Sequence, residues 1–291
     1  MPLAYIHLAP QLLSNKKMDT QRSSYRYDSF TGKEQVEEFE RLYRQASSLI
    51  ETERQLWPGL NIAKGQRVLD VGCGSGVITR EIAKQVYPAP VVGLDMSQAL
   101  LEKGRQMGAD SSQNITFQAG SAYDLPFADN SFDIVYARLL FQHLSEPLTA
   151  LNNIWRVLKP GGLLCILDVD RDWSSLYPEP ASSVALDQAI IKTQIAEGGD
   201  PWVGRKRSYY LKSCQFSQVK TTISLIDSDR LGTERFFGML SLGEAGKAVH
   251  DDIKQVQGSA KADVKALVND PYVWAGFGLF VVTGRKPVLS K

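Results

Sequence analysis

The chain has 291 residues, with 33 lysines and arginines against 32 aspartates and glutamates, giving a net charge of +1. A chain of this length can bury one large core, and its balanced charge creates no general field that would attract nucleic acid or an anionic membrane. Composition therefore gives no support to a basic nucleic-acid binder and favours a small-molecule partner.

The N-terminal 21 residues are interrupted by prolines and lack a basic region ahead of their apolar positions, so they predict neither a signal peptide nor a membrane span. No later run has the length of about 18 apolar residues that a membrane helix needs. The three cysteines, Cys73, Cys165 and Cys214, have no CxxC spacing and are expected to be reduced thiols. We therefore expect a cytoplasmic protein.

Residues 34–57 predict a long amphipathic helix that precedes the first strand and packs over its ligand-binding end. Its apolar positions recur at steps of three and four: Val36, Phe39, Leu42, Tyr43, Ala46, Leu49 and Ile50. Arg41 and Gln45 lie one turn apart on the opposite, polar face, for which a solvated surface is one interpretation.

The stretch RVLDVGCGSGVITR (67–80) predicts a buried strand, a tight glycine turn and the start of a helix. Nicotinamide-binding turns have the spacing G-x-G-x-x-G and bind a pyrophosphate, whereas this turn has G-x-G-x-G and an acid, Asp70, two residues before the first glycine. A carboxylate there would repel a diphosphate and suits a ligand with an ammonium group. A structural turn without a ligand is the alternative.

Residues 91–97 predict a second strand that ends at Asp95, with Ser97 capping the next helix. In a doubly wound sheet the ends of these two strands are neighbours, and a carboxylate at the second can accept hydrogen bonds from both ribose hydroxyls. Residues 115–122 and 131–138 predict two more strands, and a Pro-Gly-Gly turn leads to a fifth that ends at Asp168.

These segments resemble, in order and spacing, the motifs of the class I S-adenosylmethionine (SAM)-dependent methyltransferases, above all small-molecule enzymes with a ubiquinone-biosynthesis-like core. The resemblance covers residues 60–170. It implies an α/β fold with a doubly wound, Rossmann-like, seven-stranded and mostly parallel sheet. It also implies that SAM donates a methyl group to O, N or C of a small-molecule acceptor by in-line displacement and leaves as S-adenosyl-L-homocysteine.

Two other functions fit the same core: methyl transfer to protein or RNA, and regulation by SAM binding without catalysis. No basic groove is evident in the sequence, and the motif typical of nucleic-acid amino-methylating enzymes is absent after the fourth strand. We expect a monomer or a homodimer that needs no metal, since no His, Asp or Cys cluster has metal-ligand spacing.

The resemblance also implies which residues bind the cofactor. Asp70 would meet the methionyl amino group, and the glycines would face the nucleoside. Met96 would pack on the adenine or simply fill the core, and Ser121 stands where many relatives have an acid that meets the adenine amino group. The full expected set is Tyr27, Arg41, Gln45, Asp70, Gly72, Cys73, Gly74, Asp95, Met96, Ser121, Ala122 and Arg138.

Ahead of the core, the R-L-x-x-Q pattern of residues 41–45 occurs in related enzymes on a helix near the cofactor, so Arg41 and Gln45 have this second interpretation. Tyr25, Tyr27 and Phe30 precede that helix. These aromatic rings can either close over the sulfonium by cation–π contact or anchor the N-terminal arm.

Arg138 and His143 follow the fourth strand, whose end lies beside the transferred methyl group in this fold, and are the candidate catalytic residues. Arg138 can hold the carboxylate of the cofactor or an anionic acceptor. His143 has an ordinary pKa near 6.5, which suits a general base at neutral pH. The alternative for His143 is a capping or packing role.

Beyond the fifth strand the motifs end. Residues 181–196 predict a helix and 198–205 a loop, followed by a basic triplet at 205–207 that reads as an exposed turn or an anion contact. Residues 219–225 and 277–283 predict strands. We therefore divide the chain into an N-terminal arm and helix (1–60), a SAM-binding core (61–225), an inserted helical lid (226–272) and a final strand (273–291).

Overall fold

The computed structural model describes residues 23–108, 114–240 and 251–288 and contains a seven-stranded sheet of order β3-β2-β1-β4-β5-β7-β6. Strands β1 to β5 are parallel, and β7 runs antiparallel to both of its neighbours. The strands are β1 Val68–Val71, β2 Val91–Asp95, β3 Ile115–Ala119, β4 Phe132–Arg138, β5 Leu158–Tyr177, β6 Ser217–Asp227 and β7 Trp274–Arg285. The predicted sheet is confirmed.

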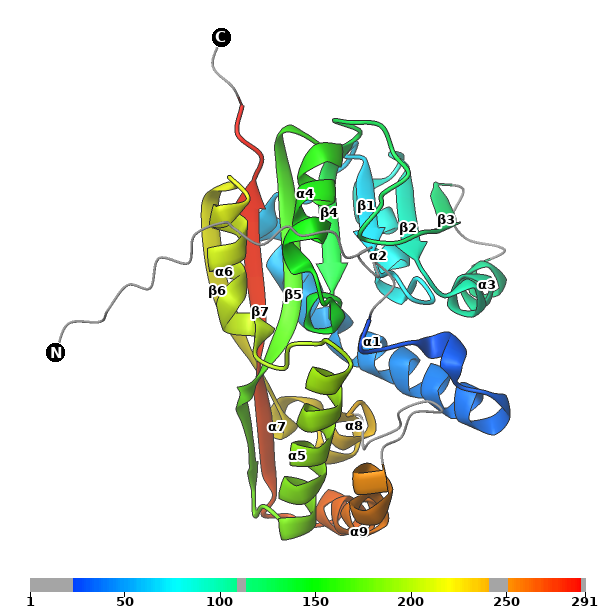
Figure 1. Cartoon of the computed structure of the whole chain (residues 1–291), viewed down its shortest axis with the longest axis vertical. Coiled ribbons are helices and arrows are strands. Elements are labelled where there is room, and N and C mark those ends of the chain that lie inside the picture. The colour runs from blue at the N-terminus through cyan, green and yellow to red at the C-terminus, as the bar shows by residue number, and fades with distance from the viewer. Residues whose placement is uncertain (1–22, 109–113, 241–250, 289–291) are drawn as a thin grey trace, which may run out of the picture.

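Helices cover both faces of this sheet (Figure 1). They are α1 Gly32–Leu60, α2 Val77–Val86, α3 Gln98–Met107, α4 Pro147–Val157, α5 Ala181–Ala196, α6 Val203–Ser213, α7 Ser228–Leu231, α8 Thr233–Gly238 and α9 Asp251–Val268. Successive residues of β4 explain the two layers, because Tyr136 packs with α1 and α2 while Ala137 packs with α4 and α6. The order of the strands reverses between β1 and β4, which is where ligands bind in such folds.

Strands β5, β6 and β7 extend beyond the parallel part of the sheet, and α5, α7, α8 and α9 lie along this extension (Figure 1). The sequence predicted the fifth strand only as far as Asp168, whereas β5 continues to Tyr177 after a bulge between Val169 and Ser174. Its second half is polar and lacks the apolar pattern that identifies a buried strand. The extension supplies a second surface on which helices pack, beside the ends of β1 and β4.

Several expectations for the additions are confirmed and one is wrong. The predicted helices at 34–57 and 181–196 correspond to α1 and α5, and helices α7 to α9 lie between β6 and β7 as predicted. The basic triplet at 205–207 is not an exposed turn, because it belongs to α6 and Arg207 is fully buried. The expectation for the first 21 residues, and part of the lid (241–250), lie outside the described residues.

Two glycines of the turn after β1 differ in their surroundings although both have positive φ. A Cβ at Gly76 would lie 2.3 Å from the Phe117 ring, whereas a Cβ at Gly74 would have no atom within 4 Å. Gly76 is therefore required for packing, and Gly74 borders open space.

We expect Gly76→Ala to lower the free energy of unfolding by about 1 to 3 kcal/mol more than Gly74→Ala does. Both changes cause backbone strain of about 1 to 2 kcal/mol at positive φ, but only the first overpacks the core against Phe117. Urea unfolding of the two variants measures the difference. Equal losses would contradict the packing role of Gly76.

Candidate active site

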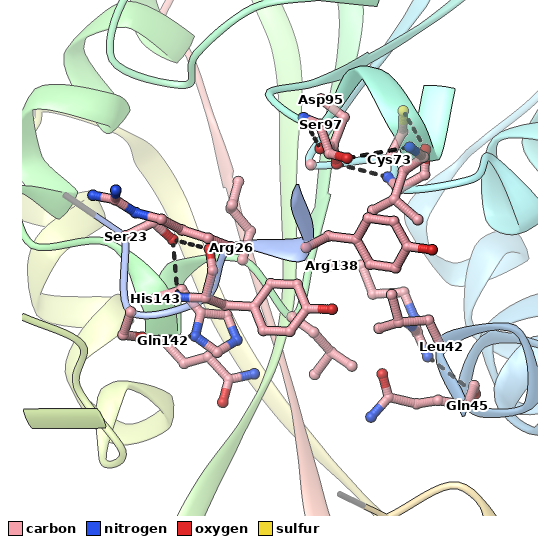
Figure 2. Close-up of a pocket in the computed structure, with 18 of the residues that line it drawn as sticks. Ser23, Arg26, Leu42, Gln45, Cys73, Asp95, Ser97, Arg138, Gln142 and His143 are labelled. Carbon is pink, nitrogen blue, oxygen red and sulfur yellow. Dashed lines mark hydrogen bonds between the residues drawn. The ribbon is translucent and has the colours of Figure 1, made fainter. Parts of the chain in front are cut away.

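A cavity of about 690 Å³ lies where the strand order reverses, between the turn after β1, helix α1 and the N-terminal arm, and it continues toward α5, α9 and β7. Figure 2 shows its lining, with Asp95, Ser97 and Cys73 at one end and His143 and Gln142 at another. All twelve residues expected to bind a cofactor border this cavity, as does His143. The structure therefore brings together the residues that the sequence singled out.

The glycine turn presents bare backbone to the cavity. Gly72 and Cys73 donate their N–H groups to the carbonyl of Leu94 at 2.7 and 3.1 Å, and Gly74 donates to Asp95 Oδ2 at 2.8 Å. These bonds fix the turn against the end of β2. The open space at Gly74 is the kind of place where a ligand can press against backbone.

Asp70 is a buried carboxylate at the end of β1, only 2% exposed. Thr79 donates its hydroxyl to Oδ2 at 2.6 Å. Burial raises the pKa of Asp70 to about 7; the charges of Glu53 and Asp95 also raise it, while the Thr79 hydrogen bond and the Arg138 charge lower it. A buried acid whose ionised form is this costly fits a cationic ligand group such as an ammonium.

Asp95 holds the turn and the next helix at once, since its oxygens accept from the N–H of Gly74 and the N–H of Ser97, each at 2.8 Å. Burial raises its pKa. A carboxylate has about four acceptor sites, so it can still accept hydrogen bonds from ribose hydroxyls. Ser97 caps α3 by accepting from Leu100 N at 3.1 Å, as predicted, and also donates to Asp28 at 2.6 Å.

The expected adenine end contains Met96, Ser121 and Ala122. Met96 is 49% exposed, so the alternative that it fills the core is wrong. Ser121 Oγ accepts from Tyr123 N at 3.2 Å. The sulfur of Cys73 lies 3.6 Å from the Gly74 carbonyl at the same end of the cavity, and burial raises the thiol pKa well above its usual value.

The N-terminal arm is anchored by its aromatic residues. Tyr27 donates its hydroxyl to Gln35 O at 2.9 Å, Tyr25 donates to Glu38 at 2.7 Å, and the Phe30 ring lies 6.2 to 6.3 Å from both tyrosine rings. The anchoring role is therefore observed. A contact of Tyr27 with the sulfonium stays a prediction, since the same residues line the cavity.

Helix α1 places two polar residues, Arg41 and Gln45, at the cavity. Arg41 is 7% exposed and binds Glu38 through Nε at 2.7 Å and Nη2 at 2.6 Å, and both Arg41 and Gln45 line the cavity. The interpretation of these two residues as a solvated face is therefore wrong. Their position at the cavity is what the comparison with related enzymes predicted.

Arg138, at the end of β4, contacts a residue that sequence reasoning missed. Its Nε donates to Glu53 Oε1 at 2.5 Å, and its Nη2 lies 3.4 Å from the carbonyl oxygen of Gln45. Glu53 is 0% exposed and also accepts from the Tyr136 hydroxyl at 2.6 Å. The sequence did contain a signal for Glu53, because this acid lies within the apolar stripe of the predicted helix.

His143 lies at the cavity but does not have the expected ordinary pKa. Its Nδ1 is 2.8 Å from Ser24 Oγ, its carbonyl accepts from Ser24 N at 3.1 Å, and its ring centroid lies 5.5 Å from that of Tyr25. Burial lowers the pKa of His143 to about 3, and the charges of Arg41 and Arg171 lower it too. His143 is thus neutral at pH 7, is a weaker base than expected, and anchors the N-terminal arm.

The far end of the cavity is built by elements outside the recognised motifs. Its apolar lining comes from β5, α5, α9, β7 and the segment after α8, and a few polar side chains lie among it. These residues are Gln142, Val169, Arg171, Ile190, Thr193, Gln194, Glu197, Met239, Leu240, Ile253, Phe277 and Leu279. Met239, Leu240 and Ile253 belong to the segment predicted as a lid, and the others were missed because no local pattern marks them.

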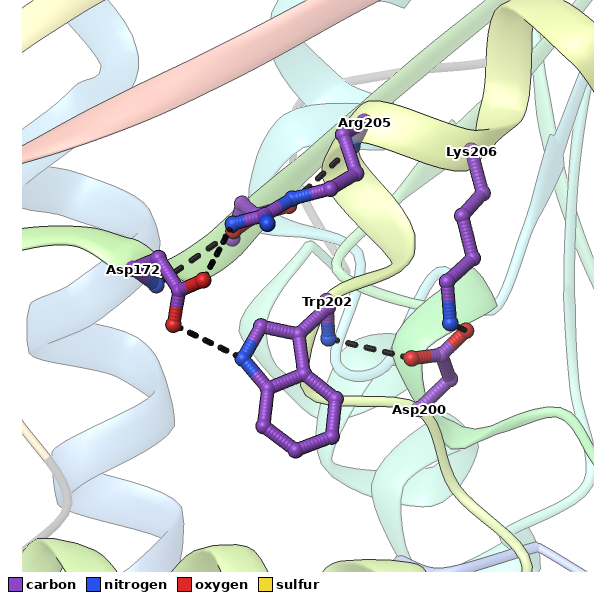
Figure 3. A network of polar contacts seen from close by, with 6 residues as sticks. Asp172, Asp200, Trp202, Arg205 and Lys206 are labelled. Atoms are coloured by element: carbon purple, nitrogen blue, oxygen red, sulfur yellow. Dashed lines mark hydrogen bonds and ion pairs between the residues drawn. The ribbon is translucent and has the colours of Figure 1, made fainter. Parts of the chain in front are cut away.

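The basic triplet of α6 pairs with acids on β5 and just before α6 (Figure 3). Arg205 binds Asp170 through Nε at 2.8 Å and Asp172 through Nη2 at 2.8 Å, and Lys206 binds Asp200 at 2.7 Å. Arg207 lies 3.3 Å from Asp168. The anion contact considered for the triplet is therefore internal.

This network supports the segment that carries His143. Asp168 Oδ2 accepts from Gln142 N at 3.3 Å, and Gln142 O accepts from Asp200 N at 2.8 Å and from Gln194 Nε2 at 3.0 Å. The backbone of Gln142 is thus held on both sides beneath the cavity.

Comparisons with known proteins agree with this geometry. Residues 69–166 match a family model described as a methyltransferase domain. An uncharacterized methyltransferase of Schizosaccharomyces pombe is 36% identical over 151 residues, which are 50% of this chain and 54% of that protein. A demethylmenaquinone methyltransferase of Symbiobacterium thermophilum is 42% identical over 113 residues, 38% of this chain and 45% of that protein.

Residues 69–166 thus resemble a methyltransferase domain, and the strand order of the sheet is that of the class I SAM-dependent methyltransferase fold. This chain spans about half the length of these two relatives. The structure of phosphoethanolamine N-methyltransferase 2 from Haemonchus contortus, solved with SAM, shares the fold with a TM-score of 0.51 and 19% identity, covering 78% of this chain and 50% of that one.

Residues 23–108, 114–240 and 251–288 lack two features. None of their helices combines the length and apolar character needed to cross a membrane. No group of three or more His, Cys, Asp or Glu side chains among them is arranged to hold a metal ion.

From the raised pKa of Asp70 we predict that cofactor binding depends on pH. An ammonium group favours the carboxylate form, and that form is lost as pH falls through about 7, while the amino group of SAM keeps its proton. We expect the affinity for SAM to fall by about tenfold or more between pH 7.5 and 5.5, measured by calorimetry. Asp70→Asn should bind more weakly at pH 7.5 and show little change over this range. A pH-independent wild-type affinity would remove Asp70 from the ammonium site.

Proposed function

We propose that this chain is a methyltransferase that moves a methyl group from SAM to O, N or C of a small-molecule acceptor and releases S-adenosyl-L-homocysteine. The observation that carries the proposal is the pairing of a buried acid, Asp70, with open space at Gly74 at the point where the strand order reverses. An ammonium and a nucleoside fit these two features, and a diphosphate does not. The SAM-bound structure that shares this fold supports the proposal.

When bound, SAM would supply a methyl group that is already activated by its sulfonium. Asp70 would hold the amino group, Asp95 the ribose, and Met96 with Ser121 and Ala122 the adenine. Arg138 would bind the carboxylate of the cofactor, and Arg41, Gln45 and Tyr27 would complete the wall beside the methionyl end.

The remaining task of the protein is to place the acceptor in line with the methyl group and to exclude water. Proximity of this kind provides about 7 to 11 kcal/mol. The arm at 23–30 closes the outer side of the cavity and is joined to Ser97 through Asp28. Base catalysis by His143 stays a prediction, and its lowered pKa favours an acceptor that needs little help to lose a proton.

The acceptor end favours a small molecule over protein or RNA. Its lining combines apolar residues of α5, α9 and β7 with a few polar groups. The demethylmenaquinone methyltransferase relative also acts on a small molecule by its name. We propose that helices α5 and α9 and the segment after α8 select the acceptor.

The direct test is to incubate the purified chain with methyl-labelled SAM and a metabolite extract. We expect label in a small molecule, and we expect Asp95→Ala to weaken SAM binding by about ten- to hundredfold, the range for hydrogen bonds to a charged group. Label in RNA or protein would support the second function, and binding without transfer would support a regulator.

A bulky residue at the acceptor end separates acceptor binding from cofactor binding. We expect Ile190→Trp to reduce transfer to the same extract at least tenfold, because the indole fills the cavity, while the affinity for S-adenosyl-L-homocysteine stays within twofold. Ile195→Trp is the matched control, since Ile195 is on the same helix, is 48% exposed and does not line the cavity. Loss of cofactor affinity in folded Ile190→Trp would show that this end belongs to the cofactor site.

A further inference from the structure

Glu53 is an acid in an apolar position. It follows Leu49 by one turn of α1 and precedes Trp57 by another, and these two neighbours are 1% and 3% exposed. Glu53 itself is 0% exposed. A carboxylate is costly in such a position, so its partners indicate what it does there.

Both oxygens of Glu53 are engaged by β4. Oε2 accepts from the Tyr136 hydroxyl at 2.6 Å, and Oε1 accepts from Arg138 Nε at 2.5 Å. Tyr136 and Arg138 are two residues apart, so they extend from the same face of the strand toward α1. Charge-assisted bonds of this kind fix the guanidinium plane as well as its place.

The held guanidinium lies at the boundary of the cavity. The Arg138 side chain is 10% exposed and lines the cavity, and its Nη2 is 3.4 Å from Gln45 O. Figure 2 shows Arg138 between the arm and the helix that carries Leu42 and Gln45. The charges of Arg138 and Glu53 both act on Asp70, with opposite signs, so all three groups are close.

Asp70 is a buried carboxylate near Arg138, and such a pair would normally form an ion pair. Here the Nε edge of Arg138 binds Glu53, and Asp70 accepts its hydrogen bond from Thr79. The cavity therefore presents an acid and a guanidinium as separate groups. This arrangement matches an amino acid zwitterion, whose ammonium and carboxylate need opposite charges side by side.

We infer that Glu53 is a positioning residue that keeps Arg138 away from Asp70 and aims it at the amino-acid carboxylate of the cofactor. The inference rests on the proposed function, because it assigns a ligand group to Arg138. Without the Glu53 charge, Arg138 would turn to Asp70 and occupy both halves of the zwitterion site.

The test compares two ligands that differ in the amino acid moiety, which carries both the carboxylate and the ammonium. S-adenosyl-L-homocysteine carries the amino acid moiety, and 5′-methylthioadenosine lacks it. We expect Glu53→Gln to weaken binding of S-adenosyl-L-homocysteine by about ten- to hundredfold and to leave 5′-methylthioadenosine within twofold, both measured by calorimetry. Arg138→Met should give the same pattern, and the double variant should lose little more than either single variant.

Binding of 5′-methylthioadenosine also reports that each variant is folded. If Glu53→Gln does not fold, Tyr136→Phe removes one bond to Glu53 and keeps the ion pair; it should weaken S-adenosyl-L-homocysteine alone, by about two- to tenfold. Equal weakening of both ligands would make Glu53 merely structural and overturn the inference, as would unchanged binding or additive losses. A wild-type chain that binds neither ligand would instead overturn the proposed function.

Discussion

One constraint shapes much of the cavity. The carboxylate of Asp70 is buried at the end of β1, where burial makes its negative charge unfavourable. Burial raises its pKa to about 7, and Thr79 supplies a neutral hydrogen bond and no charge. In the function that we propose, the free energy cost of keeping this acid ionised is recovered when the cofactor ammonium binds beside it. Stability and ligand affinity are then coupled at this residue, as is common where acids serve function more than folding.

Helix α1 completes the site from outside the sheet. Over its length it brings Arg41, Gln45 and Glu53 to the ends of β1 and β4, and each of its two buried acids, Glu38 and Glu53, is matched to an arginine and a tyrosine. Buried ion pairs contribute little net stability but are costly to break, so they fix geometry. On the helix side of the cofactor end these ion pairs fix the side chains, and on the sheet side backbone hydrogen bonds fix the glycine turn.

The sequence predicted the sheet and the glycine turn because these depend on local patterns of apolar residues and glycines. The residues expected to bind the cofactor were singled out by strand-end acids and by the family resemblance, and the structure shows that they line one cavity. The sequence did not predict contacts between distant segments. His143 contacts Ser24 in an arm 119 residues away, the partner of Arg138 is 85 residues away, and Arg205 pairs with an acid 35 residues away. Arg205 looked exposed because its partners, Asp170 and Asp172, lie in the polar half of β5, which has no strand pattern of its own.

The two ends of the cavity differ in how far their residues can be predicted from local sequence patterns, and this difference has a physical origin. The cofactor end needs backbone shape and fixed charges, which a few residues at strand ends supply in one short region. The end that we propose for the acceptor lies between α5, α9 and the extended part of β5 and β7, so its shape depends on how helices pack on strands far apart in the sequence. Changes in side-chain size there alter the cavity without disturbing Asp70, Asp95 or the glycine turn. The same core can therefore keep its cofactor site while its acceptor changes, and the acceptor has to be identified from the chemistry of that distant end.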